Sequence, residues 1–241
     1  MQSVDDKKFY DTYTGLELDP VAVKEARREE IRFGENLDAW KPCPIDESIR
    51  EMGRPPYGTR WLDYNKGDDE NVEMRSRLVV QETKRQSTIA MDDIASTTAS
   101  TPPLEIVRLF CSLCMSLQLP GGAVCVMQFL DISRAYPHCP ALRKIYVRAP
   151  DEVGLPPGMC WRMKKSWYGT RDAGQVYEFA VRDDFIANQF DQGRFSVCVY
   201  RHKTRALMYF VFGDDYVGIG CREDLEWYRS QLSLKFTVKN R

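Results

Sequence analysis

Apolar residues recur along this chain with two different periods. Short runs rich in β-branched and aromatic residues have the period of strands, and apolar residues three and four apart have the period of helices. The first pattern predicts strands at residues 60–65, 72–81, 145–148, 160–165, 195–201, 206–212 and 236–238. The second pattern predicts helices at residues 19–33, 101–117, 172–188 and 223–234.

Polar segments and segments rich in Pro and Gly separate these elements. The polar residues 1–18 are expected to be poorly ordered, as chain termini often are. Residues 41–60 contain several Pro and Gly and predict an irregular connection. The polar residues 83–101 predict a loop.

Two of the predicted elements carry too many apolar residues for a position on the surface. Residues 123–130 form a nearly continuous apolar run of strand length, which predicts a fully buried central strand. The helix at residues 101–117 has two apolar rows, and a helix that is apolar on two sides belongs in the core. One row is Leu104, Val107, Cys111 and Cys114, and the other is Ile106, Phe110, Leu113 and Leu117.

A short acidic turn lies between two strongly apolar strands. Gly213 and the pair Asp214-Asp215 predict a hairpin whose arms are buried and whose tip carries two carboxylates. Two unneutralised charges there would destabilise the fold, and a divalent cation held by carboxylate oxygens would remove that penalty. A polar hairpin turn without a metal is the alternative.

A third carboxylate, Asp131, comes at the end of the predicted central strand. Such a position suits either chemistry or a helix cap. The order of strand, helix, two strands and helix around it resembles the split βαβ arrangement, which belongs to the α+β class. A central strand beside the hairpin would bring Asp131, Asp214 and Asp215 together, and they could hold two divalent cations for phosphoryl transfer.

Positive charge is concentrated in short segments. The 241 residues have a formal net charge of -1, so nucleic-acid binding would depend on local basic strips. Residues 162–171 contain four positive residues and no acid up to Arg171, with Trp167 and Tyr168 between them. Arg75 and Arg77 alternate along a predicted strand. These segments fit either a polyanion surface or ordinary solvated and core positions.

The cysteines, the histidines and the hydropathy of the chain argue against several other kinds of site and segment. The eight cysteines lie mostly in apolar runs, which is typical of reduced core residues. The C-x-x-C pair of Cys111 and Cys114 lies in a helical pattern without a second pair, which disfavours structural zinc. The two histidines are too few for a triad or a metal cluster. Since no run of eighteen apolar residues occurs and the first residues are polar, we expect neither a membrane span nor a secretory signal.

Five blocks of this sequence together resemble the reverse transcriptases of copia-type LTR retrotransposons, over roughly residues 20–241. The block that contains Asp131 reads Q-F-L-D-I-S-R-A-Y and is similar to the family's Q-L-D-V-K-N-A-F. Residues 163–173 read M-K-K-S-W-Y-G-T-R-D-A and resemble L-K-K-S-L-Y-G-L-K-Q-A. The remaining blocks are F-G-D-D at residues 212–215 in place of Y-V-D-D, R-S-R-L-V-V at residues 75–80, and T-P-P-L-E-I-V-R at residues 101–108.

The resemblance implies roles for particular residues. The acids that would bind two magnesium or manganese ions and act in catalysis are Asp131, Asp214 and Asp215. Tyr136 matches the family's aromatic residue that would exclude a ribose 2′-hydroxyl, and an ordinary core tyrosine is the alternative. The residues that would meet the incoming nucleotide are Arg75, Arg77, Tyr168 and Gly169. Lys164 and Lys165 would steady either the nucleic-acid backbone or the fold of their own strand.

The resemblance also implies a polymerase architecture and its partners. Fingers-like residues 19–122 would precede a palm at residues 123–241, whose ferredoxin-like antiparallel sheet is backed by helices. The family's thumb, ribonuclease H and integrase regions are missing from this sequence, so we expect a piece of a Pol polyprotein. Its partners would be dNTPs and a primed RNA or DNA template, in a cytoplasmic virus-like particle or in the nucleus. Two alternatives stay open: a non-catalytic relic that keeps the palm, and a template-independent nucleotidyl cyclase.

Overall fold

The computed structural model describes residues 8–68, 70–83, 87 and 100–240. This part of the chain contains five α-helices and four sheets whose strands pair antiparallel, so the predicted mixed α+β class is confirmed. The chain divides into two compact units. The first unit comprises Met1–Ala90 and Pro140–Arg171, and the second comprises Met91–Cys139 and Asp172–Arg241. Every helix in the described part is too short or too polar to span a lipid bilayer.

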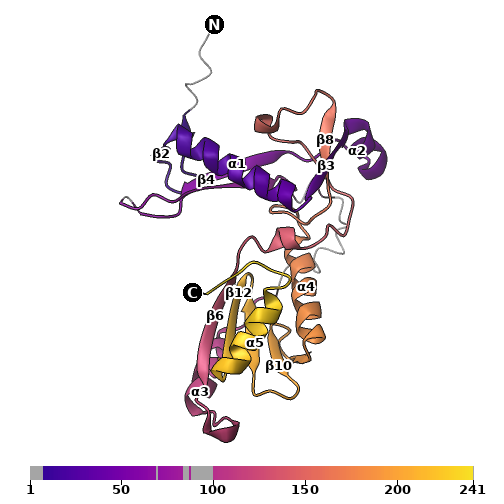
Figure 1. The fold of residues 1–241 in the computed structure, drawn as a ribbon. Coiled ribbons are helices and arrows are strands. Elements are labelled where there is room, and N and C mark those ends of the chain that lie inside the picture. Colours follow the sequence, from indigo (N-terminus) through magenta and orange to yellow (C-terminus); the bar gives the residue numbers. More distant parts are fainter. Residues whose placement is uncertain (1–7, 69, 84–86, 88–99, 241) are drawn as a thin grey trace. The chain divides into compact units, whose positions relative to one another are not determined.

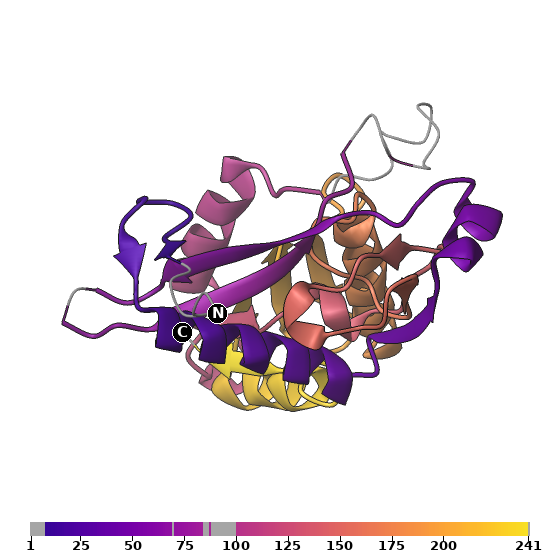
Figure 2. The same ribbon diagram turned by 90° about the horizontal axis from the view of Figure 1, so that it is seen from above.

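In the first unit, helix α1 (Pro20–Asn36) lies along an antiparallel pair formed by β4 (Thr59–Asn65) and β5 (Met74–Val80), as Figures 1 and 2 show. Asp19 caps the helix as predicted, because its carboxylate accepts hydrogen bonds from two backbone N–H groups in the first turn. The helix and both strands predicted for this part of the chain are therefore confirmed.

Two short strands, β1 (Phe9–Tyr10) and β2 (Glu17–Leu18), precede α1 and pair with each other. The side chains of Phe9 and Leu18 are buried in a small cluster with an apolar residue of α1. The expectation of poor order therefore fails for this segment, because two apolar side chains anchor it. Residues 1–7 lie outside the described part of the chain.

A three-stranded antiparallel sheet completes the first unit, in the order β3 (Trp40–Pro44), β8 (Met159–Met163) and β7 (Tyr146–Val147). The indole rings of Trp40 and Trp161 stack in its core with their centroids 4.2 Å apart. Strand β3 and the following helix α2 (Ile45–Met52) stand where an irregular connection was predicted, so that prediction is wrong. The prolines in this segment led to the wrong prediction. Strand β3 is an edge strand, and an edge strand tolerates residues without a backbone N–H.

The second unit contains a six-stranded antiparallel sheet. Its strands lie in the order β13 (Val238–Asn240), β6 (Val126–Ile132), β12 (Asp215–Gly220), β11 (Met208–Phe212), β10 (Val199–His202) and β9 (Phe190–Gln192). Within this unit, β6 is followed by α4 (Ala173–Ala187), the strands β9 and β10, the β11–β12 hairpin, α5 (Arg222–Leu232) and β13. Strands β9 and β10 extend the sheet at one edge, and the remaining strands form the rest of it. The order of these remaining elements and strands is that of a split βαβ sheet.

Helices α4 and α5 cover one face of this sheet (Figure 1). Phe185 of α4 is fully buried and stacks on Tyr200 of β10, with ring centroids 3.9 Å apart. Tyr228 of α5 packs against the same phenylalanine at 4.9 Å. Large aromatic side chains dominate the energetics of a core, so this cluster holds both helices against the sheet.

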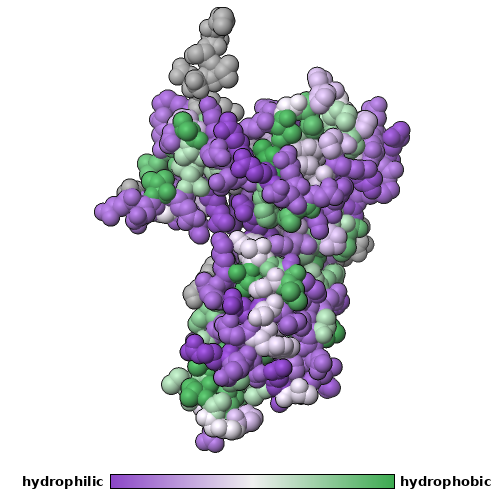
Figure 3. Space-filling model, viewed as in Figure 1, coloured by the Kyte–Doolittle hydropathy of each residue, from purple (hydrophilic) through white to green (hydrophobic). Residues whose placement is uncertain are grey.

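Helix α3 (Leu104–Ser116) lies on the opposite face and is only half-covered. Its Phe110 is buried edge-on against Phe210 of β11, with ring centroids 4.9 Å apart. Much of its other side faces solvent, and Met115 is 88% exposed. Figure 3 shows apolar surface at the lower end of the view, where α3 lies in Figure 1. The prediction of a core helix is therefore wrong, because only the row with Phe110 packs against the sheet along its length, together with Cys114 of the other row.

The prediction of a fully buried strand at residues 123–130 is also wrong. Strand β6 begins later, at Val126, and it includes Asp131. Its burial alternates, because Leu130 faces the α4 and α5 side and is 1% exposed, whereas Phe129 faces the other side and is 48% exposed. The face that carries α3 is therefore open to solvent near Phe129.

Candidate active site

The acidic turn between β11 and β12 is a tight two-residue hairpin. Phe212 pairs with Asp215 in the ladder, so Gly213 and Asp214 alone form the connection. Gly213 has a φ of +61°, and two-residue hairpins that need a positive φ at the first position favour glycine there. The turn leaves Asp214 exposed at the tip.

Replacing Gly213 with alanine should lower the free energy of unfolding by about 1–2 kcal/mol, because a residue with a Cβ is strained at this φ. A Cβ built there meets no atom within 4 Å, so no clash adds to the strain. Urea unfolding of the two proteins measures the difference. Asp214→Ala is the matched control in the same turn and should change stability by less than about 0.5 kcal/mol. Equal losses in the two variants would contradict the assignment of strain to Gly213.

The ladder between β6 and β12 places Asp131 directly opposite Asp215. Residues that face each other across an antiparallel pair share one face of the sheet, so the two carboxylates project from the same side. Asp214 adjoins them, because the N–H of Ile132 donates a 2.9 Å hydrogen bond to its backbone oxygen. Acids from two distant parts of the sequence therefore lie at one end of the sheet.

The donor atoms of these three acids suit a hard divalent cation. Carboxylate oxygens are the ligands that magnesium and manganese prefer. Like charges that face each other across a ladder destabilise it, and a cation between Asp131 and Asp215 would reverse that effect. Within the described residues, no three Asp, Glu, His or Cys side chains already form a metal cage. The backbone thus brings the acids together, and their side chains would have to turn toward a shared ion.

A positive residue that the sequence analysis did not single out lies on the other side of Asp131. Strand β13 pairs with β6 so that Lys239 faces Asp131. One face of the sheet therefore carries a row across four strands, consisting of Phe212, Asp215, Asp131 and Lys239. A positive charge in this row partly offsets the two negative ones.

Tyr136 follows Asp131 through a sharp turn. Arg134 in that turn has a φ of +52°, which is uncommon for a residue with a side chain and indicates a backbone determined by its surroundings. The half-buried ring of Tyr136 packs edge-on against Tyr177 of α4, with centroids 6.0 Å apart. The hydroxyl of Tyr177 lies 3.3 Å from that of Tyr216 in β12. Tyr136 is therefore linked through the core to the strand that begins at the acidic pair.

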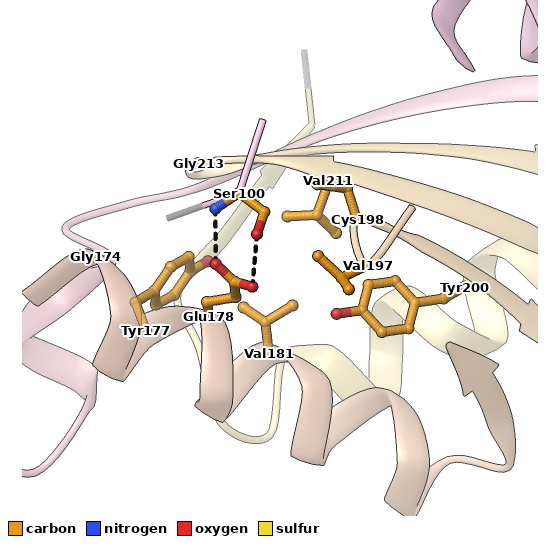
Figure 4. Close-up of a pocket in the computed structure, with 10 residues that line it drawn as sticks. All are labelled: Ser100, Gly174, Tyr177, Glu178, Val181, Val197, Cys198, Tyr200, Val211 and Gly213. Atoms are coloured by element: carbon orange, nitrogen blue, oxygen red, sulfur yellow. Dashed lines mark hydrogen bonds between the residues drawn. The ribbon is translucent and has the colours of Figure 1, made fainter. Parts of the chain in front are cut away.

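A small cavity adjoins the acidic turn on the α4 side of the sheet (Figure 4). It encloses about 330 Å³ including its open mouth, and Gly213 and the ring of Tyr200 belong to its lining. On one side, the N–H and the hydroxyl of Ser100 donate to the two carboxylate oxygens of Glu178, at 2.7 and 3.0 Å. The turn therefore borders open space there, and no local sequence signal marks the Ser100–Glu178 pair.

In the first unit, β5 contacts the segment that follows β8. The guanidinium carbon of Arg77 lies 5.2 Å from the ring centroid of Tyr168. The N–H of Val80 donates a 2.8 Å hydrogen bond to the backbone oxygen of Tyr168, and the indole N–H of Trp167 donates to β5 at 2.9 Å. Arg75 lies two residues before Arg77 and therefore on the same face of the strand. The structure thus places three of the predicted nucleotide contacts beside one another.

Gly169 occupies a position that only glycine fits. Its φ is +84°, and a Cβ built there would lie 2.1 Å from the backbone oxygen of Val80. The close approach of this turn to β5 therefore requires a residue without a side chain.

Lys164 and Lys165 are anchored to the chain just before β3. The Nζ of Lys164 lies 2.6 Å from Oδ2 of Asp38. Both backbone N–H groups donate to the carbonyl oxygen of Ala39, at 2.8 and 3.2 Å. These contacts favour a role for the two lysines in holding the segment after β8 against the segment before β3. The two lysines also belong to a different compact unit from the three acids.

Glu82, which lies just after β5 and just before the segment expected to be a polar loop, is a buried carboxylate. It accepts hydrogen bonds from the Arg143 guanidinium and from the N–H of Arg171, which is 2.9 Å away. Burial by itself would raise the pKa of Glu82, but these donors and the Arg143 charge hold that pKa below its usual value. A single acid in a polar stretch gives no sequence signal of such burial.

Comparison with protein families gives one match that covers most of the chain. A family model described as "Reverse transcriptase (RNA-dependent DNA polymerase)" matches residues 50–240. The matched region includes both the acids of the second unit and the β5 segment of the first. No curated protein matches the chain.

Proposed function

The chain belongs to the family of reverse transcriptases (RNA-dependent DNA polymerases), and from this membership we propose that it extends a primer with deoxynucleotides on an RNA or DNA template. The observation that carries the proposal is the cross-strand pairing of Asp131 with Asp215 beside the exposed Asp214. Template-directed synthesis needs little covalent chemistry from the protein, so positioning and electrostatics supply most of the catalysis. Three acids at one end of a well-packed sheet suit that task.

In this proposal, Asp131, Asp214 and Asp215 would hold two magnesium or manganese ions. When bound, such ions would activate the primer 3′-hydroxyl and stabilise the leaving pyrophosphate. The two ladders on either side of β6 fix the backbone of Asp131. Asp214, at the exposed tip, keeps the freedom to turn toward an ion.

The nucleotide contacts are assigned to both units. Tyr136, five residues after Asp131 in the sequence, would lie under the sugar and exclude a 2′-hydroxyl. In the first unit, Arg75 and Arg77 would grip the triphosphate, since guanidinium geometry suits phosphate oxygens. Tyr168 and Gly169 would approach the nucleotide and template. Lys165, and Lys164 where it is released from its ion pair with Asp38, would add contacts to the nucleic-acid backbone.

We assign the second unit to the palm of the polymerase and the first unit to its fingers. The split βαβ order of the six-stranded sheet supports the first assignment. A boundary at residue 122 would place α3 with the fingers, whereas its packing against Phe210 supports a place with the palm. As a copia-type domain, the chain would work beside the other enzymes of a Pol polyprotein, in a cytoplasmic particle or in the nucleus.

Primer extension tests the proposal directly. The protein is given a primed RNA template, dNTPs and magnesium, and we expect template-dependent lengthening of the primer that EDTA abolishes. A non-catalytic relic would give no product with any template or with either metal. A nucleotidyl cyclase would release pyrophosphate without template or primer. Either of these results would overturn the proposed activity.

A further inference from the structure

Two cysteines face each other across strands β3 and β8 of the first unit. Cys43 and Cys160 are direct partners in the antiparallel register, and their Sγ atoms lie 3.6 Å apart. Both are free thiols in the structure. We infer that this pair is an oxidisable site at which a disulfide forms between the two strands. The inference does not depend on the polymerase activity.

The backbone already has the spacing that a disulfide needs. Facing residues of an antiparallel pair have Cα atoms about 4.5–5.5 Å apart, and disulfides span Cα distances of about 4.4–6.8 Å. Because the two sulfur atoms are in contact, side-chain rotation can complete their approach without movement of the strands. Pro42 and Pro44 fix their own φ on either side of Cys43, so the backbone of this part of β3 has little freedom.

The other neighbouring cysteines have a different arrangement. Cys111 and Cys114 lie one turn apart on α3, and Cys111 is exposed. The Sγ of Cys114 lies 3.8 Å from the carbonyl oxygen of Cys125, which precedes β6. These three cysteines provide an internal comparison for the facing pair.

The oxidation needs an acceptor for two electrons, and a small disulfide such as oxidised glutathione can serve. The thiolate of Cys43 attacks one glutathione sulfur, breaks its S–S bond, and forms a mixed disulfide as one reduced glutathione leaves. The thiolate of Cys160 then attacks the Cys43 sulfur and displaces the second glutathione. The two thiol protons end on the two glutathiones, so the protein loses two hydrogens and the oxidant gains them.

Burial makes this reaction slow and sets the order of attack. Both side chains are buried, but Cys43 lies on the edge strand β3 and Cys160 on the central strand β8. The oxidant therefore reaches Cys43 first, when β3 opens briefly. Burial also raises the pKa of both thiols, that of Cys160 to about 12. Few Cys43 and Cys160 thiolates therefore exist at neutral pH, so the pair stays reduced during brief exposure to an oxidant and is oxidised only during prolonged exposure.

The bond would connect residues 117 positions apart in the sequence. Closing so long a loop restricts the unfolded chain and stabilises the folded one. We expect the thermal midpoint of the oxidised protein to rise by roughly 10 °C.

Oxidation in solution tests the inference. The full chain is incubated with oxidised glutathione, the remaining thiols are blocked, and the digest is analysed by mass spectrometry. We expect a cross-linked peptide pair that contains Cys43 and Cys160, an intact mass lower by two hydrogens, and the higher thermal midpoint. Dithiothreitol should reverse all three changes.

Variants separate this pair from the other thiols. Cys43→Ala and Cys160→Ala should each lose the cross-link and the thermal shift, whereas the double variant Cys111→Ala/Cys114→Ala should keep both. If a buried variant fails to fold, the cross-linked peptide of the parent protein decides. A digest that shows other cysteine pairs but never this one would overturn the inference. So would a stable glutathione adduct on Cys43 that does not resolve.

Discussion

Asp214→Ala should reduce primer extension by at least about a hundredfold while leaving the protein folded. The side chain lies at the exposed tip of the hairpin, so its loss removes no packing. It would remove one of three carboxylates proposed to hold the cations, and with it charge stabilisation that matters most in the transition state. Single-nucleotide incorporation on a primed RNA template, with enzyme in excess, measures the effect on the chemical step.

Asp183→Ala is the matched control for this prediction. Asp183 is also the exposed member of an acidic pair, but it lies on α4 and forms an ion pair with Arg182 at 2.9 Å. Its loss should change the rate by less than about twofold, since a surface ion pair is worth little. An Asp214→Ala protein that extends primers at the parental rate would refute the assigned role of the hairpin. Circular dichroism of both variants confirms that the comparison is between folded proteins.

Glu82→Ala should destabilise the first unit by about 3–5 kcal/mol, because it removes a buried carboxylate from its ion pair with the Arg143 guanidinium. The hydroxyl of Tyr57 and the N–H of Arg171 donate to the Glu82 carboxylate at 3.2 and 2.9 Å, and both also lose their acceptor. The thermal midpoint should fall by roughly 10 °C. Tryptophan fluorescence is a suitable probe, since four of the five tryptophans lie in this unit.

The stability that the Glu82 carboxylate provides should also depend on pH. The pKa of Glu82 in the folded protein is lowered, and an unfolded glutamate titrates near pH 4.3. Its contribution is therefore complete above about pH 4.3 and is lost as the pH falls through the lower folded value. Glu82→Gln should lose stability less steeply than the parent over this acidic range. Glu17, which is 53% exposed in its pair with Lys8, provides the control, and Glu17→Ala should change stability by less than about 1 kcal/mol.

Elements specified by neighbouring residues were predictable from the sequence. Asp19 and Pro20 mark the start of α1 because capping and a preset φ are local effects. The turn at Gly213 was predictable for the same reason, since a two-residue hairpin has strict backbone requirements. The order of elements also predicted that Asp131 would come from a strand separate from the acidic hairpin.

Features that depend on the covering of a face were not predictable. The two apolar rows of α3 look alike in sequence, yet only the row with Phe110 meets the sheet along its length. Phe129 in β6 follows the same rule, because it is 48% exposed on one face of the sheet whereas its neighbour Leu130 is buried on the other. Local pattern reports that a residue is apolar, and it does not report what packs against it.

Registers and distant partners explain the remaining gaps at the candidate site. Lys239 faces Asp131 only because β13 returns to pair with β6, and the short run at residues 236–238 carries no information about that register. Glu82 meets Arg143 from 61 positions away, so neither residue marks the other in the sequence. Cross-strand partners become visible only when the topology is known.

The last described strand has a structural consequence beyond the residue it places beside Asp131. Val238–Asn240 covers the side of β6 that β12 leaves open, so β6 is an interior strand of the sheet. A chain shortened before Val238 would expose the N–H and C=O groups along one margin of β6. Such a margin is a template for pairing with a second molecule. A truncated protein would then be prone to self-association through β6, the strand that carries Asp131.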